Sequence, residues 1–460
     1  MVFASPVFLF IFMPVTLVLY WLAPQRFRNA LLLLASLLFY AWGEPVYVLL
    51  MLFSIVLNYL LSHAIENRRS RGLMFIAVGL NLGMLAVFKY ANFIITSLNA
   101  AFRLNLPGAV LSLPVGISFY TFQILSYVID VWRGNVPAQE SIVKFGAYVT
   151  MFPQLIAGPI VRYADVAEQL ENRSLSAENM AAGARRFCLG LAKKVMIANF
   201  MAEIADLAFE LPASSMHWTA AWLGAAAYAF QIYFDFSGYS DMAIGLGGLL
   251  GFRFNENFDY PYISCSMREF WRRWHISLSS WFRDYLYIPL GGNRKGVART
   301  YCNLLIVFAL CGLWHGASWT FVVWGLYHGL FLVLERQRIV RHALEKLPGI
   351  VCWIYAMVAV GIGWVFFRAE TLANAAAYLG AMFGGTGATT ALELMKRRAV
   401  PAFVLGALYS FPILPWLKKT RLAQSSAGLL GGTLVCLVLL AICMVLLAGG
   451  TYNPFIYFRF

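Results

Sequence analysis

The sequence predicts an all-α, polytopic integral membrane protein, and two observations carry that prediction. Hydrophobic residues make up 61% of the 460 residues and charged residues only 12%, a balance that soluble domains do not show. The stretch from Tyr301 to Leu334 contains no charged residue. As one helix it would run about 51 Å, whereas the hydrocarbon core of a bilayer is about 30 Å thick. The stretch must therefore break, and Gly312, Gly316 and Gly325 are the expected places.

Further apolar runs bring the expected number of transmembrane helices to about ten to twelve. In order, they cover residues 6–22, 30–62 as a hairpin that turns at 43–45, 72–91, 114–133, 217–251, 350–367, 400–416 and 428–449. Between Lys144 and Arg162 a short uncharged stretch contains two prolines, which favours a re-entrant or tilted segment that lines a cavity. Residues 165–194 are polar and basic and predict a surface helix on the cytoplasmic side.

The net charge of +14 could indicate a nucleic-acid partner, but the basic residues lie in short connectors between apolar runs. That distribution indicates orientation in the membrane and contact with anionic lipid, so we expect no nucleic-acid partner. Placing the basic clusters that follow residues 22 and 62 in the cytoplasm puts the N-terminus outside. Residues 1–22 lack the pattern of a cleavable signal and are expected to be a retained helix. The seven cysteines have no metal-binding spacing, and no metal site is expected.

Three ionisable side chains deep in apolar runs are candidates for function. Counted inward from Arg299, His315 lies roughly 24 Å along a helix, and an ionisable residue at that depth is a functional candidate by default. The alternative is a structural histidine whose ring is satisfied by a neighbouring carbonyl. Asp235 and Asp241 lie in the 217–251 run and must pair or face water there. We expect them to be structural partners of buried cations.

A basic, aromatic stretch from Arg268 to Arg299 precedes the His315 run. It carries seven arginine and lysine residues against two acidic ones, with aromatic residues interleaved. One interpretation is an amphipathic helix in the membrane interface, with its rings in the headgroup layer. Another is a cytoplasmic site for a multiply phosphorylated cofactor, because arginine forks match phosphate oxygens. Both can hold. At the other end of the chain, the aromatic cluster around Tyr457 is typical of an interfacial anchor.

Six sequence blocks between about residues 110 and 330 carry a resemblance. They are 114–123 (PVGISFYTFQ), 152–159 (FPQLIAGP), 236–241 (FSGYSD), 255–261 (NENFDYP), 271–279 (WRRWHISLS) and 313–316 (LWHG). With them the chain closely resembles the membrane-bound O-acyltransferase family, particularly its branch of bacterial alginate O-acetyltransferases. By that resemblance His315 occupies the position of the family's essential buried histidine, and His275 that of its second motif position. The ending FIYFRF resembles a terminus of this branch in which the tyrosine, here Tyr457, is proposed to carry the acyl group.

The resemblance implies a ring of helices with re-entrant segments around a funnel whose thin floor holds the histidine. It implies acetyl-CoA as the cytoplasmic acetyl donor, with Arg272 and Arg273 as candidates for its phosphates. The acceptor would be a polysaccharide hydroxyl outside the membrane, with alginate favoured, reached through periplasmic partner proteins. We expect an inner-membrane protein with a periplasmic N-terminus and one membrane domain, residues 1–460. Its motif core would cover about 110–330, peripheral helices 1–110 and 350–450, and an aromatic tail 451–460.

The expected chemistry is proton abstraction from a hydroxyl by neutral His315. Within the enzyme class, other cell-envelope polymers remain open as acceptors: acetyl transfer to peptidoglycan or cellulose, and D-alanyl transfer to teichoic acid. A different class is also open, because buried aspartates, glycine breaks and a proline-broken short segment suit a transporter or pore equally well. A transporter should tolerate His315→Ala better than a catalyst does, and it should not consume acetyl-CoA.

Overall fold

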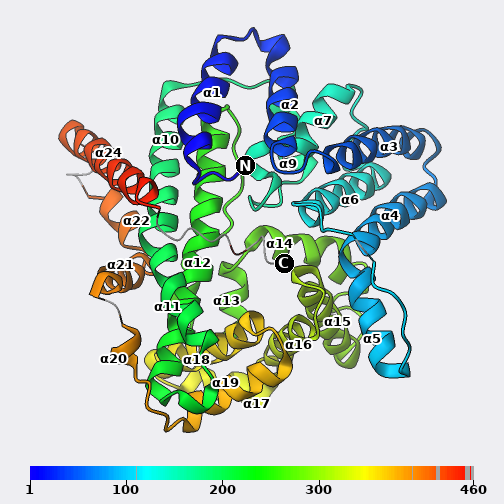
Figure 1. The fold of residues 1–460 in the computed structure, drawn as a ribbon. Coiled ribbons are helices and arrows are strands. Elements are labelled where there is room, and N and C mark those ends of the chain that lie inside the picture. Colours follow the sequence, from blue (N-terminus) through cyan, green and yellow to red (C-terminus); the bar gives the residue numbers. More distant parts are fainter. Residues whose placement is uncertain (110, 396, 421–424, 451–455, 457–460) are drawn as a thin grey trace. The chain divides into compact units, whose positions relative to one another are not determined.

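The computed structural model describes every residue except 110, 396, 421–424, 451–455 and 457–460 (Figure 1). The described residues form helices, with strand-like pairing only at two isolated bridges, Met216 with Thr389 and His217 with Thr386. The chain divides into two compact units, the first made of Met1–Phe187 and Met242–Asn255 and the second of Cys188–Asp241 and Glu256–Phe460. The expectation of one membrane domain over residues 1–460 stays a prediction.

Within the described part of the chain, five helices are long and apolar enough to cross a bilayer, which confirms the membrane class. They are α3 (Tyr47–Arg68), the continuous run Arg71–Phe102, α15 (Val297–His315), α18 (Gly349–Arg368) and the run Ala427–Ala448 within α24 (Ser426–Ala448). Four shorter apolar helices accompany them: Phe8–Leu22, Trp319–Leu334, Leu372–Gly384 and Val400–Tyr409. Neither the expected total of ten to twelve spans nor the ring arrangement is tested by these lengths, and both stay predictions.

The first unit contains the predicted hairpin and the predicted proline-broken segment. Its helices are η1 (Phe8–Phe12), α1 (Met13–Leu22), α2 (Gln25–Ala41), α3, α4 (Arg71–Leu85), η2 (Ala86–Tyr90), α5 (Ala91–Phe102), α6 (Ile117–Arg133), α7 (Ile142–Thr150), α8 (Phe152–Leu155) and α9 (Tyr163–Glu171). The turn between α2 and α3 covers residues 42–46, as expected for Gly43 and Pro45. Helices α7 and α8 replace one span by two short, largely buried pieces, because the chain breaks just before Pro153.

Two helices pass from one unit into the other. Helix α10 (Ala177–Ala192) has its last residues in the second unit, and α12 (Trp218–Leu249) has residues 218–241 there. The second unit continues with η3 (Lys193–Ala198), α11 (Asn199–Glu210), η4 (Ala213–Ser215), η5 (Pro261–Ile263), α13 (Met267–Arg273), α14 (Ile276–Phe282), η6 (Arg283–Tyr287), α15, α16 (Trp319–Leu334), α17 (Arg338–Lys346), α18, α19 (Leu372–Gly384), α20 (Ala391–Leu394), η7 (Arg397–Ala399), α21 (Val400–Tyr409), α22 (Ile413–Lys418) and α24.

The long uncharged run breaks at one of the three expected glycines. Helix α15 ends at His315, Gly316 is extended with φ −161°, and the Ser318 side chain caps α16. Gly312 and Gly325 stay helical and serve a different purpose. A Cβ on Gly312 would lie 2.1 Å from the carbonyl oxygen of Phe321 on the paired helix. The absence of side chains at these glycines therefore lets α15 and α16 approach closely (Figure 1).

The expectation of a single surface helix over 165–194 is wrong at its end. The region forms α9, α10 and the start of the π-helix η3, and its last two lysines pair with the acidic residues of α12. Lys193 Nζ lies 2.6 Å from Asp241, and Lys194 Nζ lies 2.6 Å from Asp235. Both aspartates thus have cationic partners, as the sequence predicted. The polar pattern predicted that both lysines face water. They instead pair with the aspartates, because a buried carboxylate without a cationic partner is costly at that depth.

Candidate active site

His315 is the last residue of α15 and lies in an aromatic cage within the second unit. Its ring centroid is 5.0 Å from that of Trp314, 5.2 Å from that of Trp324 and 5.2 Å from that of Phe367, each pair nearly edge to face. The side chain is buried. Gly316 makes this arrangement possible, because a Cβ there would lie 2.1 Å from the ring of Phe321.

His275 lies between two short helices and is held in one tautomer. It caps α14 in the left-handed conformation, with φ 44°, and its Nδ1 is 3.0 Å from the side-chain oxygen of Asn257. The backbone N–H of Ser277, which can only donate, reaches the same atom and identifies it as oxygen. His275 therefore donates from Nδ1, and Nε2 carries the lone pair.

The second ring nitrogen of His275, Nε2, is buried, and the ring lies close to that of His315. The side chain is 1% exposed, and among the described residues Nε2 has no hydrogen-bond partner. The ring centroids of His275 and His315 are 6.5 Å apart. The structure thus brings together the two histidines that the sequence singled out, although 40 positions separate them in the chain. Nε2 of His275 therefore remains open as a hydrogen-bond acceptor in this enclosed, apolar setting.

The expectation of one interfacial helix across the basic stretch is wrong. The helix breaks between Arg273 and Ile276 into α13 and α14, and its rings pack inward instead of lying in a headgroup layer. Phe270 is fully buried, and Trp271 and Trp274 are nearly so. Glu335 holds the start of α13, because its carboxylate accepts the backbone N–H groups of Met267 and Arg268 at 2.7 and 2.9 Å.

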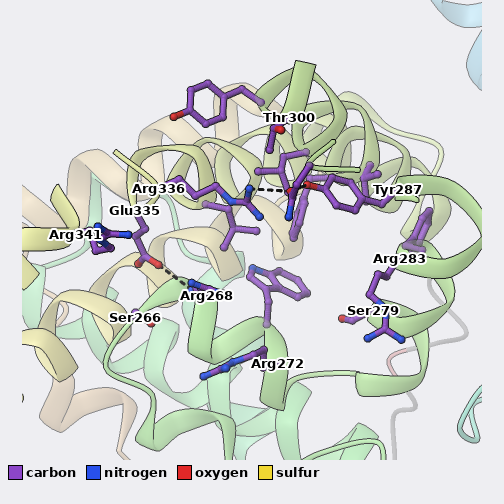
Figure 2. Close-up of a pocket in the computed structure, with 18 of the residues that line it drawn as sticks. Ser266, Arg268, Arg272, Ser279, Arg283, Tyr287, Thr300, Glu335, Arg336 and Arg341 are labelled. Atoms are coloured by element: carbon purple, nitrogen blue, oxygen red, sulfur yellow. Dashed lines mark hydrogen bonds between the residues drawn. The ribbon is translucent and has the colours of Figure 1, made fainter. Parts of the chain in front are cut away.

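A cavity of about 1050 Å³ opens on this basic stretch, and we call it the arginine cavity (Figure 2). Five arginines line it: Arg268, Arg272, Arg283, Arg336 and Arg341. Trp271, Phe282, Tyr287, Tyr301 and Phe308 supply aromatic walls. The volume is at the upper end of small-molecule pockets, about 300–1,000 Å³. Several arginines with aromatic rings are suited to a large ligand that combines phosphates with a flat ring.

The two arginines predicted to bind phosphate differ. Arg272 lines the cavity and has no carboxylate partner among the described residues, and Arg268 has none either. Arg273 is not in the wall; it pairs with Asp259 at 2.9 Å and with Glu269 at 3.0 Å. Its guanidinium is therefore already engaged. Arg336 and Arg341 were not among the residues singled out from the sequence. They follow the uncharged run, and they lie beside the basic stretch only because the chain turns back between α15 and α16.

A second cavity of about 750 Å³, which we call the polar cavity, is lined by other residues of the same unit. Its polar lining includes Glu210, Gln231, Ser318, Thr320, Arg368, Glu370 and Asn374, and its apolar lining includes Phe321, Phe367 and Ile456. Arg368 pairs with Asp206 at 2.6 Å. Among the described residues the side-chain oxygen of Gln231 is buried without a hydrogen-bond partner. Nothing in the local sequence pattern pointed to this cavity.

His315 adjoins the walls of both cavities. Cys311, one helical turn earlier on α15, lines the arginine cavity, and Phe367, whose ring contacts that of His315, lines the polar cavity. Tyr457, the third predicted catalytic residue, lies outside the described residues. Its neighbour Ile456 is described: it is buried, lines the polar cavity and donates its backbone N–H to Asp235 at 2.9 Å.

Comparison with known proteins identifies the family. Residues 136–365, half of the chain, match the MBOAT, or membrane-bound O-acyltransferase, family. A protein of Pseudomonas putida named "Probable alginate O-acetylase AlgI" is 43% identical over the whole of both chains. A "Peptidoglycan O-acetyltransferase" of Helicobacter pylori is 37% identical over 84% of this chain and 80% of its own length. A "Teichoic acid D-alanyltransferase" of Streptococcus thermophilus is 31% identical over 48% of this chain. This chain therefore belongs to the membrane-bound O-acyltransferase family, and it is an O-acyltransferase.

Proposed function

We propose that the protein transfers acetyl groups from cytoplasmic acetyl-CoA towards a polysaccharide hydroxyl outside the membrane, with alginate as the favoured acceptor. The observation that carries the proposal is the place of His315 beside a wall of each of two cavities. A histidine so placed can serve a donor on one side and a hydroxyl on the other. Only the acetyl group then needs to cross the membrane, while the charged donor stays on the cytoplasmic side and the polymer stays outside.

The donor occupies the arginine cavity in this proposal. Five arginines and the aromatic walls suit the phosphates and the adenine ring of CoA. Arg268 and Arg272 are the phosphate ligands of choice, because no carboxylate among the described residues neutralises them. Arg273, the other candidate from the sequence, is the less favoured phosphate ligand in this proposal, because its guanidinium pairs with two acids. The positive-inside rule assigns this basic surface to the cytoplasm of the bacterial inner membrane and the N-terminus to the periplasm.

The chemical step is an ordinary acyl transfer with His315 as base. His315 takes the proton of the attacking hydroxyl, the hydroxyl oxygen bonds to the thioester carbonyl carbon, and the carbon–sulfur bond breaks. The thiolate leaves and recovers the proton as free CoA. With Tyr457 as first acceptor, the acetyl group passes from a thiol of pKa about 8.5 to a phenol of about 10, and then to an alcohol nearer 15.7. Each transfer therefore runs towards the less reactive ester, and a periplasmic partner takes the group onward.

The relatives support alginate ahead of other acceptors, since the match to the P. putida protein spans both chains. The peptidoglycan enzyme of H. pylori keeps peptidoglycan as the second candidate. Membership of an acyltransferase family sets the transporter alternative aside.

The decisive experiment incubates the purified protein with isotopically labelled acetyl-CoA and follows CoA release and label on the C-terminal peptide. We expect label on Tyr457 that disappears in His315→Ala, together with onward transfer to alginate when the periplasmic fraction is added. CoA release without label on Tyr457, unchanged in Tyr457→Phe, would exclude the tyrosine carrier and leave direct transfer. Preferential acetylation of peptidoglycan fragments would reassign the acceptor.

A further inference from the structure

Helix α17 (Arg338–Lys346) connects two apolar helices and has no buried residue of its own. It follows α16 (Trp319–Leu334) and precedes α18 (Gly349–Arg368). A helix of nine residues is marginal in water by itself, because isolated helices need about 12–15 residues and most helical stability comes from packing of an apolar face. Support for α17 must therefore come from a surface that the helix covers when the protein is in its membrane.

The residues of α17 separate into apolar and basic rows along the helix. Residues four positions apart lie one above the other on the same face. The apolar rows are Ile339 with Ala343 and Val340 with Leu344, and the basic row beside them is Arg338, His342 and Lys346. The side chain of Ile339 is 85% exposed. An apolar face bordered by basic side chains is typical of a helix that lies in the headgroup layer of a bilayer.

The position of α17 in the chain and its charge indicate the same partner. Both neighbouring helices are apolar, and α18 is long enough to cross a bilayer, so α17 lies where they leave the hydrocarbon. Its three cationic side chains, Arg338, Arg341 and Lys346, stand against one carboxylate, Glu345. This positive excess complements the headgroups of anionic phospholipids.

Another side of α17 belongs to the wall of the arginine cavity. Arg341, Leu344 and Glu345 line that cavity (Figure 2), and Nε of Arg341 lies 3.7 Å from the Glu345 carboxylate. Ile339 is on the far side of the helix from Arg341, because two residues turn a helix by about 200°. One short helix therefore presents an apolar and basic surface outwards and a cavity-lining arginine inwards.

We propose that α17 lies on anionic phospholipid at the membrane surface and that this contact sets the position of Arg341 in the arginine cavity. Anionic lipid then raises the affinity of the cavity for its ligand without touching that ligand. The part of this inference that concerns acetyl-CoA rests on the proposed function. The lipid contact does not, and the two are tested by separate readouts.

The lipid contact is measured by hydrogen exchange of residues 338–346 in the full-length protein. The protein is placed in nanodiscs of phosphatidylcholine with or without phosphatidylglycerol, and exchange is read by mass spectrometry. We expect exchange about tenfold slower with phosphatidylglycerol, because each lysine or arginine near an anionic surface strengthens association roughly fivefold. High salt should remove the difference. Equal exchange rates in the two kinds of nanodisc at low salt would overturn the proposal.

The matched variant Arg338→Gln with Lys346→Gln removes two cations that are not in the cavity wall. Its exchange rates should be equal with and without phosphatidylglycerol. A lipid-dependent rate as large as that of the parent would show that the basic row of α17 is not the lipid contact, which also contradicts the proposal.

The effect on the cavity is measured as affinity for a non-hydrolysable acetyl-CoA analogue, by isothermal titration in the same nanodiscs. The ratio of affinities with and without phosphatidylglycerol should be about threefold or more higher in the parent than in the Arg338/Lys346 variant. Comparing the two proteins cancels the repulsion of the analogue by anionic lipid. Arg341→Gln should lose this difference in affinity but keep the lipid-dependent exchange of α17.

Equal affinity ratios in the parent and the Arg338/Lys346 variant would remove the coupling to the cavity. If no analogue binds in either kind of nanodisc, the donor site of the proposed function fails, and the exchange rates still decide the lipid contact.

Discussion

The side-chain oxygen of Asn257 lies 3.0 Å from Nδ1 of His275 and holds the ring with Nε2 as its basic nitrogen. The same oxygen accepts the hydroxyl of Ser277 at 2.8 Å, and the amide nitrogen of Asn257 donates to Ser240 at 3.0 Å. The side-chain oxygen of Asn257 thus holds the imidazole, while its side-chain nitrogen anchors Asn257 to Ser240. The network fixes the ring of His275, whose centroid lies 6.5 Å from that of His315.

Asn257→Ala should lower the rate of acetyl transfer because it releases His275 from its tautomer and orientation. We expect a loss of about tenfold in kcat, smaller than the 10²–10⁴-fold that a general base contributes, because Asn257 acts only through the orientation of His275. The KM for acetyl-CoA should change little. Ser277→Ala is the control: it removes one donor to Asn257 but leaves the bond to His275, and it should cost much less. Equal losses in the two variants would contradict a specific role for the tautomer.

His275 should make stability depend on pH. It lies outside the long apolar helices, and burial lowers its pKa to about 3, whereas an unfolded chain has the ordinary value near 6.5. Between those pKa values the unfolded state binds more protons than the folded state. The contribution of His275 to the free energy of unfolding is therefore fully present above pH 6.5 and is lost as the pH falls towards 3. The loss from pH 7 to pH 5 is about 2 kcal/mol. Thermal melting in detergent should show this slope, and His275→Asn, which keeps a donor towards Asn257, should flatten it.

His315→Ala should reduce CoA release from acetyl-CoA by about 10²–10⁴-fold, the range that a general base contributes. Donor affinity should stay within about threefold, because His315 is not among the residues that line the arginine cavity. Isothermal titration with a non-hydrolysable acetyl-CoA analogue measures that affinity. A variant that loses donor binding and turnover together would indicate a collapsed cage of rings and not a missing base.

Arg272 and Arg273 are adjacent, yet their replacement should have different effects. Arg272→Ala removes a charged hydrogen-bonding group worth about 1.5–3 kcal/mol, so the KM for acetyl-CoA should rise by roughly 10–100-fold and less so at high salt. Arg273→Ala leaves the cavity wall intact and breaks the contacts to Asp259 and Glu269, so it should mainly lower the melting temperature. A larger effect on KM from Arg273 would reverse this assignment.

Gly312→Ala should destabilise the protein through the contact of α15 with α16. The added methyl group would lie 2.1 Å from the carbonyl oxygen of Phe321, and overpacking of this kind costs about 1–3 kcal/mol. Gly349→Ala, at the start of α18, has nothing within 4 Å of the added Cβ and serves as the control. Thermal unfolding followed by size-exclusion chromatography compares them, and equal melting temperatures would mean that the two helices can separate at little cost.

Much of the fold was predictable because hydrophobic patterning and helix breakers act locally. The apolar runs located α3, α15 and α18, and the Gly43–Pro45 turn located the α2–α3 hairpin. The uncharged run had to break because it exceeds the bilayer thickness, although only Gly316 of the three candidate glycines is the break. The sequence could not choose among them, because Gly312 and Gly325 are required by contacts between helices and not by the path of the chain.

The sequence by itself determined the membrane class, the family and the two buried histidines, since these follow from composition, run length and short motifs. Only the tertiary structure decided which arginines share a cavity, because Arg272 and Arg273 differ in their partners and not in their local pattern. It also buried the rings of α13 that were expected in the headgroup layer, because the rest of the second unit offered them an apolar core. The contacts of Asn257 with His275 and of Asp235 with Ile456 join residues 18 and 221 positions apart, and no local pattern encodes contacts that exist only once the chain has folded.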